Sequence, residues 1–278
     1  MHAPFAESPE FRRLLAGVQD VDLTRISLEI ARDAYPDLNP QPYLDTIESL
    51  AARVRERCTA GAGPRQILGQ INEVLFVEEG FRGNTEAYYD PRNSFLNDVM
   101  DRKMGIPISL SVLYMALADR VGLAMSGVNL PAHFVVRTGA GDETIFVDPF
   151  HAGILLDRYG CEKRVSELAG EPIELDDAQV APCSSAVVVA RMLRNLKAIY
   201  IHENAFVSAL AVLRRLAALS RDDPQERRDL GIACVHASCP GEAIDHLNAY
   251  LSNYPNAEDA DTIRSLLRTA RHESASRN

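Results

Sequence analysis

Two residues with the chemistry of an acid–base pair lie close together in the middle of the chain. His133 stands in the run PAHFVVR, and Asp148 stands in the run IFVDPF that follows a short glycine-containing turn. A carboxylate that holds one imidazole nitrogen orients the ring and leaves the other nitrogen to act on a proton. The pair therefore predicts the orienting half of a triad of nucleophile, histidine and acid.

The two runs have the composition of strands, because β-branched and aromatic residues flank the turn TGAGD. A symmetric hairpin centred between Ala140 and Gly141 sets His133 directly opposite Asp148 on one face. Directly opposed residues have Cβ atoms about 4.5–5.5 Å apart, close enough for a carboxylate to hold an imidazole. The prediction depends on register, since a slip of one residue moves the two side chains to opposite faces. The pair also has a purely structural interpretation, in which it ties two strands together.

The nucleophile of such a triad is missing from its expected place. No cysteine lies between Cys58 and Cys161, although the run GIPISLSVLYMALADRVG predicts a buried helix that begins just after Gly105. Ser109 is the alternative nucleophile, in the first turn of this helix, where the helix dipole favours developing negative charge. Its other interpretation is a hydroxyl that caps the helix or packs within it.

A metal site is a third interpretation of the same region. His133, Asp148 and His151 carry groups that bind divalent cations, but no closed set of ligands emerges from their spacing. Cys234 and Cys239 lack the CxxC spacing of a zinc site and have no matching second pair. We therefore expect neither a metal nor another cofactor.

The composition is that of a soluble globular protein of about two domains. Of the 278 residues, 46% are hydrophobic and 24% charged, and the net charge of −10 argues against nucleic-acid or membrane-surface partners. The uncharged run Met104–Ala118 has 15 residues and is too short to span a bilayer. The first residues have no signal-peptide character, and five scattered cysteines are typical of reduced thiols. These features predict a cytoplasmic protein.

The first part of the chain, to about residue 104, is predicted to be helical. Apolar residues recur at steps of three and four in helices near 41–58 and 64–78. Ser8 stands before a proline that suits the first position of another helix. Strands are expected only in the section 105–165, so the predicted fold class is a mainly helical α+β fold.

The segment 80–94 is dense in Gly, Asn, Asp and Pro and is predicted to be a loop. Arg92 and Asn93 in this loop are candidates for lining a pocket. Their alternative roles are in the turn itself and, for Asn93 or Ser94, as the cap of the next helix.

From about residue 184 the chain is again helical and has a period of 34 residues. In the second unit, Gly231, Ala243 and Tyr250 stand at the offsets of a tetratricopeptide repeat, where small residues let paired helices approach closely. In the first unit, Lys197 replaces one of these small residues. Two units and a terminal helix make a short stack, which should need the preceding domain to cover one end.

Three segments followed by these repeats resemble the bacterial SirB-type proteins, in which a transglutaminase-like domain precedes tetratricopeptide repeats. The segments are GIPISLSVLYMALADRVGL, PAHFVVR and FVDPFHAGILL, and the resemblance extends from about residue 22 to residue 255. It implies a transglutaminase-like, cysteine-proteinase-like domain with a helical N-terminal region over residues 1–183. A tetratricopeptide-repeat helical domain is expected over residues 184–278.

Enzymes of the wider superfamily use a Cys–His–Asp triad, and the resemblance assigns His133 and Asp148 to its last two members. In that superfamily the cysteine stands two residues after a glycine that lies 17 positions before a second glycine. Gly105 and Gly122 have this spacing, so Pro107 stands at the place of the nucleophile. The resemblance therefore implies a degenerate triad, since a proline offers no nucleophile.

The resulting expectation is a non-catalytic scaffold or regulator that binds a protein partner through its C-terminal repeats, with a homo-oligomer left open. One alternative is a hydrolase or acyltransferase that uses Ser109 with His133 and Asp148. Two residues along a helix turn a side chain by about 200°, so Ser109 should point away from the place that Pro107 takes. A second alternative is a module that binds a small ligand in the residual pocket.

Overall fold

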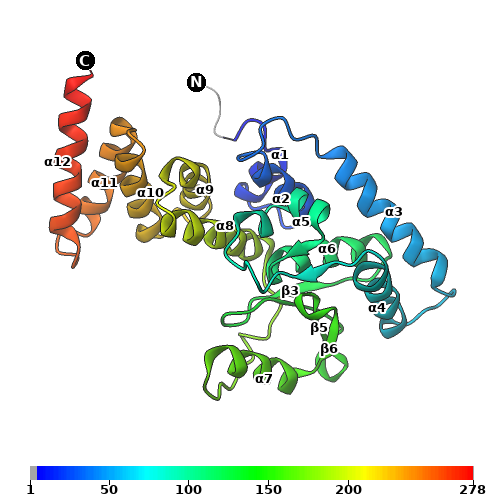
Figure 1. Cartoon of the computed structure of the whole chain (residues 1–278). Coiled ribbons are helices and arrows are strands. Elements are labelled where there is room, and N and C mark those ends of the chain that lie inside the picture. The colour runs from blue at the N-terminus through cyan, green and yellow to red at the C-terminus, as the bar shows by residue number, and fades with distance from the viewer. Residues whose placement is uncertain (1–4, 278) are drawn as a thin grey trace. The chain divides into compact units, whose positions relative to one another are not determined.

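The structure is a computed structural model that describes residues 5–277. It divides into two compact units, Met1–Met192 and Leu193–Asn278, whose boundary falls inside helix α8 (Ser185–His202). Figure 1 shows the helices and strands of both units. In the described part of the chain, every helix is too short or too polar to cross a membrane.

The first unit is a mainly helical α+β structure, as the sequence predicts. Its α-helices are α1 (Pro9–Leu15), α2 (Leu23–Ala31), α3 (Gln41–Arg57), α4 (Pro64–Asn72), α5 (Leu96–Arg102), α6 (Pro107–Arg120) and α7 (Arg158–Ala169). Its short helices are the π-helix η1 (Glu73–Glu78) and the 3₁₀ helices η2 (Pro91–Asn93), η3 (Gly141–Glu143) and η4 (Pro149–His151). Its strands are β1 (Arg82–Gly83), β2 (Met104–Gly105), β3 (Ser126–Val128), β4 (Val135–Thr138), β5 (Ile145–Asp148) and β6 (Ile154–Leu156).

Helix α6 is the centre of this unit. It is buried continuously from Pro107 to Ala118, so all of its sides face other parts of the protein. A helix that is apolar all round requires such an enclosed position. Helices α2, α3, α4 and α5 and strands β3 and β4 all contact it. Helix α6 is therefore fixed from several directions.

Strands β3, β4, β5 and β6 form an antiparallel sheet in that order (Figure 1). Val136 pairs with Val147, and Thr138 pairs with Ile145. The predicted symmetric hairpin is therefore wrong by two positions. The 3₁₀ helix η3 takes up residues of the turn and moves the centre of the hairpin toward β5. A shift of two leaves the faces unchanged, because side chains alternate with a period of two.

The second unit, beginning within α8, contains the helical repeats. Helices α9 (Phe206–Leu219) and α11 (Pro240–Asn253) begin and end 34 residues apart, as the sequence period predicts. The remaining helices are α10 (Pro224–His236), which pairs with α11, and the terminal α12 (Ala260–Ser276).

Small residues bring the helices of the second repeat together. Gly231 of α10 faces Leu247 of α11, and Ala243 is fully buried. The hydroxyl of Tyr250 donates a hydrogen bond to Asp259 at 2.8 Å, just before α12 begins. These contacts join three successive helices.

Lys197 of α8 stands 34 residues before Gly231, where the second repeat has its glycine. Its ammonium group lies 2.7 Å from a carboxylate oxygen of Glu226 and 2.6 Å from one of Asp229, both on α10. The long side chain thus reaches the next repeat through charged contacts. This explains why a lysine is tolerated at a position where small residues are usual.

We predict that Gly231→Ala destabilises the protein even though alanine is the better helix former. The added Cβ would lie 2.5 Å from Cδ2 of the buried Leu247, so α10 and α11 would have to move apart. Overpacking of this kind costs about 1–3 kcal/mol, which urea unfolding would measure. Gly241→Ala in α11 is the matched control, because its added Cβ meets no atom within 4 Å. Equal stability of the two variants would contradict the close approach of the helices.

Candidate functional site

Helix α6 begins with Pro107, at the place where the nucleophile is expected. Proline suits the first helical position because its missing N–H is not needed there and its φ angle is already helical. The residue is buried, and its ring carries no thiol or hydroxyl. The geometry therefore accounts for this proline as a helix start.

Ser109 lies two residues further, in the first turn of the same helix. Its side chain is 1% exposed. Its hydroxyl donates to the carbonyl oxygen of Asn93 at 2.6 Å and accepts from the N–H of Ile106 at 3.1 Å. A Cβ added at Gly105 would lie 2.7 Å from this Oγ, so the preceding strand has room only for glycine. Ser109 thus joins the loop to the helix start.

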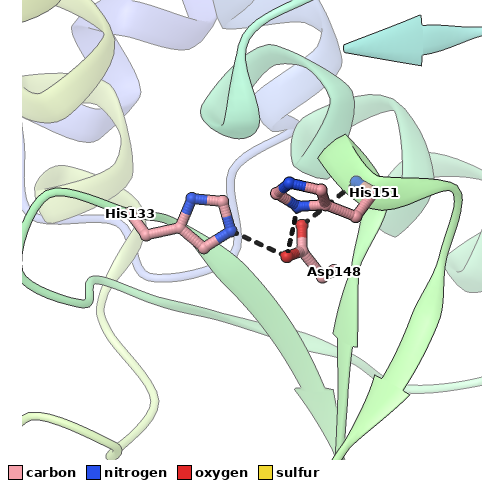
Figure 2. Close-up of side chains that lie close together, drawn as sticks. All are labelled: His133, Asp148 and His151. Carbon is pink, nitrogen blue, oxygen red and sulfur yellow. Dashed lines mark hydrogen bonds and ion pairs between the residues drawn. The ribbon is translucent and has the colours of Figure 1, made fainter. Parts of the chain in front are cut away.

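The structure places His133 and Asp148 within hydrogen-bond distance (Figure 2). Nε2 of the imidazole lies 2.9 Å from Oδ2 of the carboxylate. The two residues are not directly opposed, because the pairing of β4 and β5 is shifted by two positions from the predicted one. His133 instead precedes β4 and reaches Asp148, the last residue of β5, diagonally.

Asp148 has further partners that come from the chain after it. His151, at the end of η4, places Nδ1 at 2.7 Å from the same Oδ2. Its backbone N–H also donates to Oδ1, because Asp148 is the N-cap residue of η4. Arg164 of α7 brings Nε to 3.4 Å from Oδ2. One buried carboxylate therefore collects positive or hydrogen-bond-donating groups from three segments.

These partners keep Asp148 ionised. Burial alone would raise the pKa of its carboxyl group, since a charge is poorly solvated inside the protein. The hydrogen bonds from His133 and His151 outweigh this effect and lower the pKa well below its usual range. Asp148 is thus an anion that holds two imidazole rings.

A cysteine does lie near this cluster, close to the carboxylate of Asp148. Cys161 of α7 is completely buried. Burial, with a smaller contribution from the charge of Asp148, raises the pKa of its thiol to about 12. A thiol with so high a pKa supplies almost no thiolate at neutral pH, so Cys161 does not replace the missing nucleophile.

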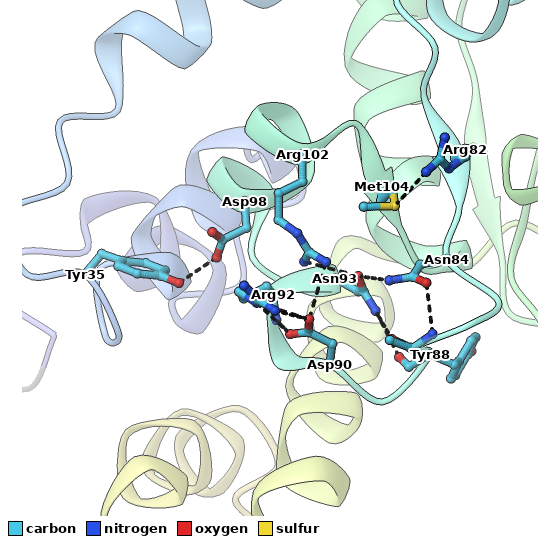
Figure 3. Close-up of polar contacts among 11 residues, drawn as sticks. Tyr35, Arg82, Asn84, Tyr88, Asp90, Arg92, Asn93, Asp98, Arg102 and Met104 are labelled. Atoms are coloured by element: carbon cyan, nitrogen blue, oxygen red, sulfur yellow. Dashed lines mark hydrogen bonds and ion pairs between the residues drawn. The ribbon is translucent and has the colours of Figure 1, made fainter.

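Asn93 organises the loop 80–94 from the inside (Figure 3). It is fully buried, its amide donates to the carbonyl oxygen of Ala87 at 2.7 Å, and its Oδ1 accepts from Asn84 at 3.0 Å. The sequence-based idea that Asn93 or Ser94 caps the next helix is wrong, because α5 has Phe95 at its N-cap position. The Asn93 amide instead forms its hydrogen bond with the backbone of the loop itself.

Arg92 is exposed and forms an ion pair with Asp90 at 2.7 Å, visible in Figure 3. Its hydrogen bonds lower the pKa of the Asp90 carboxyl group. Both polar ends of this pair lie within the loop. The role of Arg92 and Asn93 in lining a pocket stays a prediction.

An aromatic ring packs beside both histidines, a contact that the sequence analysis did not predict. The ring of Phe150 lies 6.3 Å from that of His133 and 5.1 Å from that of His151, edge to face. Tyr88 from the loop packs on Phe150 at 6.2 Å. A Cβ at Gly83 would lie 2.6 Å from the Phe150 ring, so β1 approaches the turn only because it carries a glycine. The motif DPFH contains the signal, since its aspartate caps η4 and its proline begins that helix, which directs the next two rings.

We predict that His133→Ala lowers the free energy of unfolding at pH 7 by about 1–3 kcal/mol, because it removes a partner from a buried carboxylate. The pKa of Asp148 is depressed in the folded state, so its ionic contribution is present above the unfolded pKa of about 3.9 and is lost below it. The loss caused by the substitution should therefore shrink as the pH falls below about 4. His151→Ala is the control with a smaller effect, because His151 is 32% exposed and water can replace it.

Thermal or urea unfolding of the parent and both variants at several pH values measures these effects. A His133→Ala variant as stable as the parent at pH 7 would show that the hydrogen bond contributes nothing to the fold.

Two family models match the chain in succession. The first, described as the transglutaminase-like superfamily, matches residues 41–194, and the second, a tetratricopeptide repeat, matches residues 196–268. The chain is 35% identical over 255 residues to a UPF0162 protein of Xylella fastidiosa, covering 90% of this chain and 91% of the relative.

More distant relatives extend over a similar length. A UPF0162 protein of Vibrio cholerae is 27% identical over 242 residues, with 85% of this chain and 89% of the relative covered. Protein SirB1 of Salmonella typhimurium is 23% identical over 238 residues, with 85% and 88% covered. The chain therefore belongs to the SirB-type UPF0162 family, in which a transglutaminase-like domain is followed by tetratricopeptide repeats.

Proposed function

We propose that this chain is a non-catalytic member of the transglutaminase-like superfamily that acts as a protein-binding scaffold or regulator. The observation that carries the proposal is the identity of the residue at the nucleophile position, Pro107. A Cys–His–Asp enzyme needs a thiolate within reach of its histidine, and proline supplies none. The retained pair of His133 and Asp148 then has a structural role, because it satisfies a buried charge.

The contacts of Ser109 argue against a serine enzyme at the same place. A nucleophilic hydroxyl must be accessible to substrate and must donate its proton to a base. The Ser109 hydroxyl is buried and donates to a backbone carbonyl instead. Activation would require breaking the contact that holds the helix start to the loop.

A groove in the second unit supports the binding of a protein partner. It has a volume of about 760 Å³ and lies between α8, the start of α9 and α10. Ile201 and Phe206 give it apolar surface, while Arg194 and Glu226 give it charges of both signs. Helical repeats use such concave surfaces for extended protein segments.

We predict that the purified protein does not turn over amide, ester or acyl-transfer substrates, and that Ser109→Ala does not change this result. Pro107→Cys tests the retained geometry directly. A thiol at a helix N-terminus beside an imidazole has a pKa below the usual value of about 8.5, so it should react with iodoacetamide near pH 6. Ser109→Cys is the control and should react far more slowly, because a side chain two residues along the helix points about 200° away from position 107.

His133→Ala in the Pro107→Cys background should slow the alkylation if the imidazole faces position 107. The competing serine-enzyme hypothesis has a distinct outcome. It would be supported by turnover in the parent that vanishes in both His133→Ala and Ser109→Ala while thermal melting stays unchanged.

Partner binding is tested by affinity capture from a cell lysate, followed by crosslinking. We predict crosslinks within residues 190–270 and loss of capture in Ile201→Asp, because a charge in the groove opposes apolar contact. Val207→Asp is the matched control, since Val207 is 75% exposed in the same unit but does not line the groove. Equal capture by both variants, or crosslinks only outside 190–270, would place the docking surface elsewhere.

A further inference from the structure

The carboxylate of Asp148 contacts two histidines, although an orienting pair requires only one. His133 alone completes such a pair, yet His151 contacts the same oxygen atom, at 2.7 Å compared with 2.9 Å for His133 (Figure 2). We propose that His133, Asp148 and His151 bind one divalent transition-metal ion of the zinc type. The proposal departs from the expectation of no metal, which was based on spacing along the sequence.

The three ligand atoms are already close enough to share an ion. Nε2 of His133, a carboxylate oxygen of Asp148 and Nδ1 of His151 lie within 4.8 Å of one another. Zinc binds such atoms at about 2.0–2.2 Å, so the ligands of a tetrahedral ion lie about 3.3–3.5 Å apart. In the present hydrogen bonds, each nitrogen lies slightly nearer the oxygen than it would in such a site. The three groups therefore need to move apart only slightly to bind an ion.

Each ring can bind the ion as a neutral imidazole, and only its tautomer has to change. In each hydrogen bond to the carboxylate, the proton sits on the nitrogen that would become the ligand. The ion takes that place when the proton moves to the other ring nitrogen, Nδ1 of His133 and Nε2 of His151. The metal thus replaces two hydrogen bonds with two coordination bonds on rings that are already oriented.

The turn that carries His151 is tied to the centre of the unit. The carbonyl oxygen of Gly153 accepts a hydrogen bond from the Asn72 side chain at 2.8 Å, and Tyr114 of α6 donates to Asn72 at 2.9 Å. Gly153 has a φ of +72°, and a Cβ there would lie 2.0 Å from Asn72. Only glycine fits this close approach, so the position of His151 is set by the fold.

The three proposed ligands are not equally buried, and the site is open to solvent on the side of His151. Asp148 is 0% exposed and His133 2%, whereas His151 is 32% exposed and offers a route for an ion. Three protein ligands with a free fourth position are typical of zinc sites that hold water or exchange ligands. Two imidazoles favour zinc, iron, copper or nickel over magnesium and calcium, which prefer oxygen ligands.

Arg164 completes the surroundings of the carboxylate. Its Nε is buried, lies 3.4 Å from Oδ2 of Asp148 and has no hydrogen-bond partner in the described part of the chain. Ligating carboxylates are commonly held by such outer partners. The positive charge of Arg164 also opposes a cation, so we expect weaker binding than in a closed four-ligand zinc site.

The test uses the full-length protein after treatment with a chelator. Calorimetric titration should give one Zn²⁺ ion per chain, and Mg²⁺ should give no binding. Co²⁺ should give an absorption spectrum without a thiolate charge-transfer band, because no cysteine is a ligand. His151→Ala should weaken Zn²⁺ binding at least about tenfold.

His151→Gln is a second variant that keeps a hydrogen-bond donor next to Asp148 but removes the imidazole ligand. It should melt like the parent without metal and lose the rise in melting temperature that Zn²⁺ gives the parent. His246→Ala is the control, since His246 also lies near a carboxylate, 3.9 Å from Glu242, but in the repeat unit. It should bind like the parent.

Two outcomes would overturn the proposal. Equal Zn²⁺ affinity in the parent, His151→Ala and His151→Gln would show an adventitious ion only. A thiolate band in the Co²⁺ spectrum would place the ion at cysteines. Turnover assays report separately on catalysis, so failure of the metal site leaves the proposal about Pro107 untouched.

Discussion

The buried charge of Asp148 is the constraint on which the first unit depends most. A carboxylate removed from water costs several kcal/mol unless donors and cations surround it. Here the donors are His133 in the loop before β4 and His151 in the turn after β5, and Arg164 of helix α7 adds a positive charge. Three segments that follow one another along the chain therefore meet at one carboxylate. A buried carboxylate needs such partners whether or not chemistry takes place beside it.

The sequence was sufficient for the periodic parts of the fold, because periodicity reflects burial directly. The 34-residue spacing of α9 and α11 and the helix at 41–57 follow from apolar and small residues alone. The register of the hairpin did not follow, since it depends on the conformation of the turn. The 3₁₀ helix Gly141–Glu143 shifts the pairing by two, which still leaves His133 on the face of Asp148. The contact was thus predictable, although the pairing that produces it was not.

Some features of the candidate site could likewise be predicted from the sequence, and others could not. The family resemblance assigned Pro107 to the nucleophile position, and the hairpin pattern predicted the contact of His133 with Asp148, because these residues belong to compact segments. The contact of Arg164 depends on how α7 packs, and the contacts of Ser109 with the Asn93 carbonyl depend on the path of a loop. Neither leaves a pattern in a single sequence. Long-range polar contacts of this kind are set by tertiary structure alone.

Lys197 determines which of the two helical repeats comes first along the chain. A glycine at this position, as in the second repeat, would pack against any helix with a matching leucine, so neighbouring repeats would be interchangeable. The lysine instead requires acidic groups on the following repeat, which Glu226 and Asp229 supply. The two repeats therefore cannot be exchanged, and a third copy inserted between them would separate a cation from its counter-ions. The length of this array is restricted by charge as well as by packing.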